Sequence, residues 1–365
     1  MLTGSNFHTR LRNGTVEVGK IYFEKWVHIS KKVLDKVPTY MYNIASNQGG
    51  IALLNPNTVE KIHNTNSNLG GHYNMTYTIE ELEQMMREND GNLELSYSGV
   101  TSLPDNLTVS EWLCLRGTPI TSLPENLTVG GNLDLRDTPI TSLPDNLKVG
   151  GSIWLEGTPI TSLPDNLTVG GDLVLSYTPV TSLPDNLAVG GNLWLDGTLI
   201  TSLPDNLTVG GDLVLNYTEI TSLSDNLTVG GDLCLKNTKI TSLPSNLTVR
   251  GNLDLRDTPI TSLPDNLRVG CHLYLRGTPI TSLPDDLTVG GDLDLNYTHI
   301  TSLPDNLAVG GNLWLEGTLI TSLPNNLKVG GNLYLSNTKI ASLPDNLTIG
   351  GKLDCRHLAI INQRH

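Results

Sequence analysis

The chain is poor in aromatic residues and cysteine, and it lacks any long hydrophobic run. Its 365 residues include two Phe, five Trp and four Cys, against 36 Gly. No apolar segment reaches the roughly 20 residues that a transmembrane helix needs. The first residues also lack the apolar core of a signal peptide. We therefore expect no membrane partner and no bulky globular core.

Positive charge is scarce as well. The chain has 23 Lys and Arg against 37 Asp and Glu, a formal net charge of −14. Such an acidic balance argues against nucleic acid or an anionic membrane as a partner. The charge is uneven, because residues 1–76 hold eight Lys and Arg but four Asp and Glu. The acidity therefore belongs to the remainder of the chain.

None of the four cysteines has an evident disulfide partner. Cys114 and Cys234 occupy the same place in repeat units that lie six units apart. At about 4.8 Å per stacked strand, their thiols would be far beyond disulfide reach. We expect free thiols for these two and for Cys271 and Cys355, and hence a reducing, cytoplasmic compartment.

Most of the chain is one repeat. Residues 91–350 form thirteen units of 20 residues without insertion, followed by a degraded fourteenth. Counted from its Leu-Pro pair, the unit reads L-P-D-N-L-x-V-G-G-x-L-x-L-x-x-T-x-I-T-S over positions 1 to 20. The alternation around positions 11 and 13 predicts a strand, and Gly-Gly and Pro-Asp-Asn predict turns. One such coil cannot bury its apolar face alone, so the coils are expected to stack.

The 20-residue period, the Leu-Pro pair and the L-x-L phrase over 91–360 resemble a leucine-rich repeat. They are similar to the short repeats of the bacterial IpaH and YopM effectors. The resemblance implies a solenoid of 13 to 14 coils, with a parallel β-sheet on one face and extended or turn segments on the other. It also implies a bacterial or bacteriophage protein, cytoplasmic or delivered into a host cytosol. The cysteine ligase domain that follows the IpaH repeats is not expected here.

Two departures from that family affect the expected cross-section. Thr118 and its equivalents replace the usual Asn, and we expect their stacked hydroxyls to form a similar ladder. Gly stands where the first Leu of the family's phrase belongs. This second departure leaves a triangular β-solenoid as the alternative fold.

The ends of the array differ from its middle. Residues 77–90 predict a capping helix, because Thr78 and Glu81 form a capping box ahead of an apolar stripe. We expect a small α+β region of unknown role over residues 1–76. The solenoid itself is expected over residues 91–365. An uncovered strand edge is a liability, so the C-terminal coil is a candidate surface for a homodimer or a partner.

Variation inside the unit is concentrated at positions 10, 12, 14 and 15, which we call the strand face. Because side chains alternate across a strand, positions 10, 12 and 14 are expected to point outward together. Trp, Tyr and Arg dominate binding hot spots, although aromatic residues also favour strand surfaces in general. The candidate partner-binding residues are Trp112, Trp154, Trp194, Tyr274, Trp314, Tyr334, Arg116, Arg136, Arg256, Arg276, Tyr177, Tyr217 and Tyr297.

The sequence contains no catalytic constellation, Gly-rich phosphate loop or metal-ligand spacing. We therefore expect no enzyme activity, no cofactor and no metal site. The predicted function is protein binding through the strand face, in a phage or bacterial host-interaction factor. The alternatives are a carbohydrate-binding, adhesive or spacer protein, and an enzyme with its site in residues 1–76 whose repeats select the substrate.

Overall fold

The computed structural model describes residues 11–12, 15–16 and 75–356. Contacts divide the chain into Met1–Gly71 and His72–His365, and each unit is described by itself. In the first unit, β1 (Leu11–Arg12) pairs with β2 (Thr15–Val16) in antiparallel fashion. Most of the α+β region predicted over 1–76 lies outside the described residues, and so do residues 357–365.

The second unit begins with a short strand and a helix. β3 (Met75–Thr76) pairs in parallel with β5 (Val100–Ser102). The helix, α3 (Ile79–Glu88), starts at the predicted capping box, in which Thr78 Oγ1 accepts from the Glu81 N–H at 3.3 Å. The Glu81 carboxylate in turn accepts from the Thr78 N–H at 2.8 Å. Leu82 and Met86 are buried where α3 meets the first coil, so the helix covers that end of the core.

No helix among the described residues is both long and apolar enough to cross a membrane.

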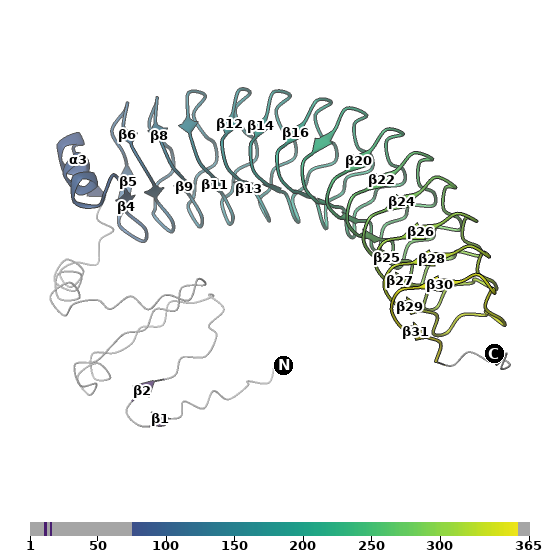
Figure 1. The fold of residues 1–365 in the computed structure, drawn as a ribbon. Coiled ribbons are helices and arrows are strands. Elements are labelled where there is room, and N and C mark those ends of the chain that lie inside the picture. The colour runs from purple at the N-terminus through teal and green to yellow at the C-terminus, as the bar shows by residue number, and fades with distance from the viewer. Residues whose placement is uncertain (1–10, 13–14, 17–74, 357–365) are drawn as a thin grey trace, which may run out of the picture. The chain divides into compact units, whose positions relative to one another are not determined.

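One strand from each coil joins a continuous fourteen-stranded parallel sheet. Each strand pairs with the one 20 residues further on, as Leu113 does with Leu133. In Figure 1 the coils stack side by side in a curved row, with this sheet along the inner side. The strands are β4 (Leu93–Glu94), β7 (Leu113–Cys114), β9 (Leu133–Asp134), β11 (Ile153–Trp154), β13 (Leu173–Val174), β15 (Leu193–Trp194), β17 (Leu213–Val214), β19 (Leu233–Cys234), β21 (Leu253–Asp254), β23 (Leu273–Tyr274), β25 (Leu293–Asp294), β27 (Leu313–Trp314), β29 (Leu333–Tyr334) and β31 (Leu353–Asp354).

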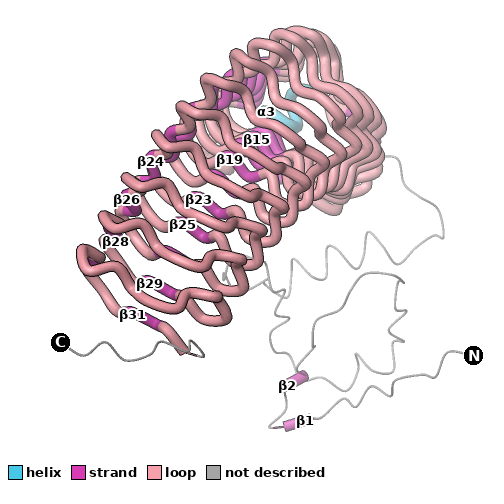
Figure 2. Tube along the Cα trace, turned by 90° about the vertical axis from the view of Figure 1, so that its right-hand side faces the viewer, coloured by secondary structure: helices cyan, strands magenta, loops and turns pink. Residues whose placement is uncertain are grey.

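Positions 6 and 7 form a second row of parallel strands, divided into a seven-stranded and a six-stranded sheet. Most of each coil outside these two rows is loop (Figure 2). The cross-section is therefore that of a leucine-rich repeat and not a triangular solenoid. The seven strands are β6 (Thr108–Val109), β8 (Thr128–Val129), β10 (Lys148–Val149), β12 (Thr168–Val169), β14 (Ala188–Val189), β16 (Thr208–Val209) and β18 (Thr228–Val229). The six are β20 (Thr248–Val249), β22 (Arg268–Val269), β24 (Thr288–Val289), β26 (Ala308–Val309), β28 (Lys328–Val329) and β30 (Thr348–Ile349).

The apolar positions of the repeat fill one long core. Leu113, Leu115 and Ile120 are fully buried, and their equivalents are buried along the array as far as Ile340, whereas Leu353 in the last strand is exposed. Removing a Leu or Ile side chain from water contributes about 1.5–3 kcal/mol. A single coil has no second layer to pack on, so this contribution depends on the coils before and after it.

The prediction that the repeated threonines form a ladder between coils is wrong. The Thr118 hydroxyl donates to the Leu115 carbonyl oxygen at 2.7 Å, three residues back in the same coil. Thr138 does the same with Leu135 at 2.7 Å. The hydroxyl is too short to reach the next coil while it satisfies this turn. These buried threonines therefore close the turn after each main strand and do not link coils.

The Gly-Gly turns are explained by the close approach of successive coils. A Cβ at Gly150 would lie 2.2 Å from the carbonyl oxygen of Gly130. Arg250 occupies this glycine position in one coil. The Cβ of Arg250 needs space that is absent between the stacked glycines of the other coils. The strands on either side of this contact are β18 and β20, and they are not paired. We attribute the division of the second row to Arg250.

Candidate functional site

The structure describes every residue that the sequence nominated for the strand face. Positions 11 and 13 point into the core, and position 12 points outward from the main sheet. Trp112 and Trp194 are each 37% exposed, whereas Trp154 and Trp314 are half-buried. The four Trp therefore differ in exposure, because Trp154 and Trp314 pack against neighbouring coils.

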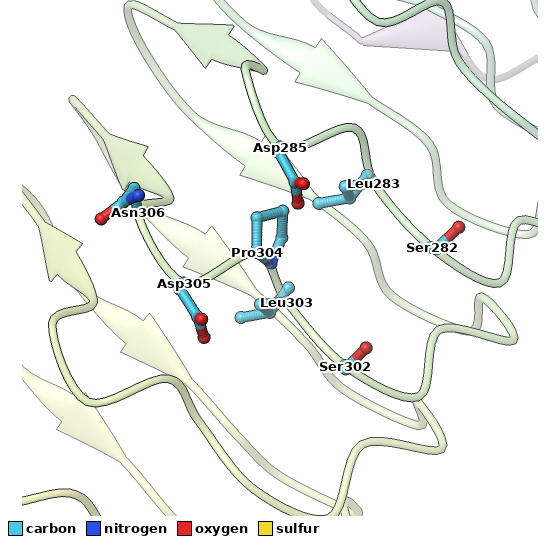
Figure 3. Close-up of a pocket in the computed structure, with 8 residues that line it drawn as sticks. All are labelled: Ser282, Leu283, Asp285, Ser302, Leu303, Pro304, Asp305 and Asn306. Atoms are coloured by element: carbon cyan, nitrogen blue, oxygen red, sulfur yellow. The ribbon is translucent and has the colours of Figure 1, made fainter.

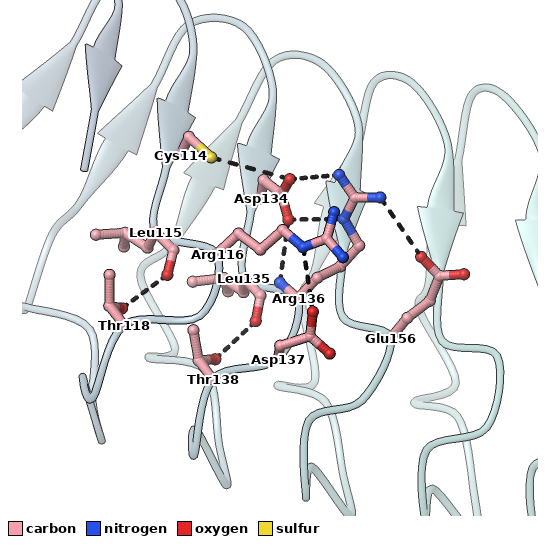
Figure 4. A network of polar contacts seen from close by, with 10 residues as sticks. All are labelled: Cys114, Leu115, Arg116, Thr118, Asp134, Leu135, Arg136, Asp137, Thr138 and Glu156. Carbon is pink, nitrogen blue, oxygen red and sulfur yellow. Dashed lines mark hydrogen bonds and ion pairs between the residues drawn. The ribbon is translucent and has the colours of Figure 1, made fainter. Parts of the chain in front are cut away.

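Arg136 is held in place by its own coil and by the next one (Figure 4). Its Nη2 donates to Asp134 Oδ2 at 2.6 Å and its Nε to Asp134 Oδ1 at 2.9 Å. This hydrogen-bonded carboxylate raises the pKa of Arg136. The guanidinium lies 5.6 Å from the ring centre of Trp154 and 4.0 Å from Glu156 Oε2. Arg136 thus joins an almost fully buried carboxylate to an aromatic ring one coil away.

The same arrangement recurs six coils later. Arg256 pairs with Asp254 at 2.5 Å, and its guanidinium lies 5.3 Å from the Tyr274 ring centre. The hydrogen bonds to Asp254 raise the pKa of Arg256. Asp134 and Asp254 were not nominated from the sequence. The Asp-x-Arg spacing over positions 12 to 14 is the signal that could have found them.

The other two arginines also lie beside aromatic rings. Arg116 lies 6.0 Å from the Tyr97 ring centre and pairs with Asp137 at 3.1 Å. Arg276 lies 5.1 Å from the Tyr297 ring centre. The structure therefore places the four predicted arginines beside aromatic residues of neighbouring coils, of which Tyr97 was not nominated from the sequence.

Trp314 and Trp194 occupy the same repeat position but have different surroundings. Trp314 stacks on Tyr334, with ring centres 5.6 Å apart and planes 4° from parallel. Trp194 contacts no other ring and no cation among the described residues. Its neighbours along the row are the buried Val174 and Val214. Trp194 is thus the position 12 indole that the protein leaves without an aromatic or cationic neighbour.

Position 15 has a structural role that the sequence interpretation missed. The backbone is left-handed there, with φ of 60° at Tyr177 and 64° at Gly197. This region favours Gly, Asn and Asp and strains other residues, so the position varies within a narrow set. A Cβ at Gly197 would lie 2.8 Å from Cδ1 of Tyr177. The tyrosine ring therefore lies over the glycine of the next coil and ties the two coils together.

Position 10 forms a side-chain ladder to the backbone. Asp172 Oδ1 accepts from the Asn192 N–H at 2.7 Å, and Asn192 Oδ1 accepts from the Asp212 N–H at 2.7 Å. His272 Nδ1 accepts from the Asp292 N–H at 2.9 Å. Asn, Asp, Ser and His can all supply this acceptor, which explains why position 10 varies among them.

Neither Cys114 nor Cys234 provides a reactive thiol. None of the four, all of which are described, forms a disulfide. Burial raises the pKa of Cys114 and that of Cys234 to about 12. At neutral pH both groups remain protonated, so neither is a nucleophile. Over the described residues, no three His, Cys, Asp or Glu side chains are grouped to hold a metal ion.

The turns on the far side of each coil present a uniform polar surface. Thr121, Ser122 and Asn126 are exposed, as are their equivalents apart from the half-buried Thr101. A shallow cavity of about 420 Å³ lies between two of these turns (Figure 3), lined by Ser282, Leu283, Asp285, Ser302, Leu303, Pro304, Asp305 and Asn306. A second cavity of about 300 Å³ is lined by equivalent residues around Asp185 and Asp205. These cavities follow from the repeat and do not mark a distinct site.

Solved structures with a similar arrangement include two YopM proteins. YopM from Yersinia enterocolitica has a TM-score of 0.47 and 21% identity over 75% of this chain and 68% of its own. YopM from Yersinia pestis has a TM-score of 0.45 and 18% identity over 75% and 92%. A leucine-rich-repeat protein from Leptospira interrogans has a TM-score of 0.39 and 17% identity over 77% and 95%.

No protein-family model and no curated protein sequence matches the chain. The structural likenesses assign no partner or activity. The repeat and its parallel strands make the chain a solenoid of the leucine-rich-repeat type.

Proposed function

We propose that the chain is a protein-interaction module that holds a protein partner on its strand face. The observation that carries the proposal is the contrast between two surfaces of the same coils. The far turns repeat nearly the same Thr, Ser, Asp and Asn in every coil, whereas the strand face presents Trp, Tyr and charged residues that differ from each coil to the next along the array. A surface built from large aromatic and charged residues on a rigid sheet is suited to a protein partner.

Trp154 and Trp314 are unsuitable for a mutational test of partner binding, because both pack on adjacent coils and their replacement would disturb the fold. Trp112 and Trp194 can be changed to Ala with less disturbance, since both are exposed. Leu199 and Leu319 are matched controls, because they are 56% and 43% exposed and lie at position 17, outside the strand face.

We would cross-link the wild-type chain in a bacterial lysate, identify the captured protein, and then measure its affinity as a purified component. The Trp112→Ala/Trp194→Ala variant is expected to bind about tenfold more weakly or worse. The Leu199→Ala/Leu319→Ala variant is expected to bind like wild type. Equal binding by the wild type and the Trp variant would contradict the proposal.

A glycan ligand is the second candidate, because the exposed indoles could also stack on sugar rings. Partner capture that is lost after glycosidase treatment of the lysate would favour it. A host-interaction role, in bacteria or for a phage, remains a prediction that depends on the identity of the captured protein.

A further inference from the structure

Negative charge is concentrated in one stretch of the array. Residues 149–235 contain ten Asp and Glu and no Lys, Arg or His. The formal net charge of the whole chain is −14, so this stretch carries most of it. The middle of the stretch is the coil that contains Trp194.

On the strand face, Trp194 lies among three of these carboxylates. Asp196 follows it by two residues, in the turn that ends the strand, and its carboxylate lies between Ser176 and Asn216, the position 14 residues of the coils before and after. Asp172 and Asp212 hold position 10 in the coils before and after. Diagonal neighbours on adjacent strands are about 7–8 Å apart, within the span of one long basic side chain. Asp172 and Asp212 each use Oδ1 for the backbone ladder, which fixes where their charges lie.

The chain itself shows how a cation is held at such a place. Two coils earlier, Arg136 lies 5.6 Å from the Trp154 ring centre and 4.0 Å from Glu156. Trp194 and Asp196 repeat the indole and carboxylate of Trp154 and Glu156 at the same positions. In place of an arginine, however, the preceding coil carries Ser176. The Asp196 carboxylate accepts hydrogen bonds only from neutral groups, Asn216 Nδ2 at 3.0 Å and Ser176 Oγ at 3.5 Å. The coil of Trp194 therefore has an indole and a carboxylate for which the described residues supply no cation.

We propose that the strand face around Trp194 binds a basic, extended segment of a partner protein. One Lys or Arg of that segment would lie over the Trp194 indole beside Asp196, as Arg136 lies over Trp154. Asp172 and Asp212 attract the flanking basic residues. This inference rests on the proposed function and names the chemistry of the partner. The basic segment is complementary in charge to residues 149–235, which contain no Lys, Arg or His.

The probe is a short synthetic peptide of repeating Gly-Ser-Arg, with repeating Gly-Ser-Glu as its control. Fluorotryptophan is incorporated into the full chain, and the Trp194 signal is assigned by its loss in Trp194→Phe. The Arg peptide is expected to move the Trp194 fluorine resonance and to leave that of Trp112, which is equally exposed, in place. The Glu peptide is expected to move neither.

Two variants with equal charge separate a local site from bulk attraction. The first combines Asp172→Asn, Asp196→Asn and Asp212→Asn, which keeps an Oδ1 acceptor, as Asn192 and Asn216 do in native coils. The second combines Asp165→Asn, Asp185→Asn and Asp205→Asn in the exposed turns, where Asn325 is native. The first variant is expected to bind the Arg peptide about tenfold more weakly than wild type. The second is expected to lose less than about twofold in affinity.

Equal weakening by the two variants, or a Trp194 signal that does not move, would overturn the inference. A Trp194 signal that shifts with protein concentration alone would assign the face to a second copy of the chain and would also overturn it. These outcomes are distinct from failure of the proposed function, because a captured partner that still depends on Trp112 and Trp194 would leave the strand-face function standing.

Discussion

At the scale of single residues, variability in this repeat has two different causes. Apart from Trp112 and Lys352, position 10 varies among residues that can accept the same backbone hydrogen bond, as Asp172 and His272 do. Position 15 varies among residues that tolerate a left-handed backbone or, like Tyr177, cover the next glycine. Trp194 has neither role. Variation alone therefore does not identify a binding residue. The contacts in the structure separate variable residues with a structural role from variable residues, such as Trp194, that have none.

The Asp134–Arg136 pair should contribute measurably to stability. In Arg136→Met, Asp134, which is 1% exposed, loses the side chain that satisfies both its oxygens. We expect a loss of about 1–3 kcal/mol in the free energy of unfolding, measured by urea denaturation. Arg116→Met is the control, because its ion pair with Asp137 is exposed and such pairs contribute about 0–1 kcal/mol. Equal losses in the two variants would contradict the assignment.

Asp196 should make stability depend on pH in a specific direction. Burial raises the pKa of Asp196, although Asn216 and Ser176 donate hydrogen bonds that partly oppose the shift. Because the pKa of Asp196 is higher in the folded chain than the ordinary value of 3.8, its protonated form stabilises the fold at pH values below 3.8. This stabilisation is lost as the pH rises through the folded-state pKa. Asp196→Asn is therefore expected to melt slightly above wild type at neutral pH, with the difference closing at acid pH. A difference that grows on acidification would exclude this explanation.

At the scale of strands and turns, the features with a local signal could be predicted from the sequence. The main strand follows from the alternation around Leu113 and Leu115, and α3 from the capping box at Thr78. The second row of strands was missed, although Leu107 and Val109 alternate around Thr108 as Leu113 and Leu115 do around Cys114. Contacts between coils, such as Arg136 with Trp154, join residues 18 apart in the sequence and have no local pattern. Most of the fold was therefore predictable, whereas the packing that sorts the site residues was not.

The break in the second row provides a test of the glycine stacking. Arg250→Gly removes the only arginine at position 8 among the described coils and should allow β18 and β20 to pair. We expect an increase of about 1 kcal/mol in unfolding free energy. We also expect slower amide hydrogen exchange in the segment around Thr248. Gly170→Arg is the converse variant and should lower stability, because a Cβ there would lie 2.0 Å from the Gly150 carbonyl oxygen. Unchanged exchange in Arg250→Gly would show that another cause divides the sheet.

At the scale of the whole array, related coils have acquired different surfaces. The segment 131–150 returns almost unchanged at 251–270, six coils later, and both copies keep the Asp-x-Arg pair. The indole of Trp314 is stacked on Tyr334, whereas its equivalent six coils earlier, Trp194, is not stacked and lies in a stretch without basic residues. We infer that the repeats provide one framework, and that the strand face differs along it in charge and in available aromatic surface.

Hydroxyl-radical footprinting of the purified chain with its captured partner tests the central claim most directly, because it reports side-chain exposure at each residue. Binding through the strand face predicts slower oxidation of Trp194, Tyr177 and Tyr217, which are exposed in the free chain. It predicts unchanged oxidation of Leu199 and Leu319, which lie outside that face. Protection of the two leucines with no change at Trp194 would show that the partner binds elsewhere, and would contradict the account.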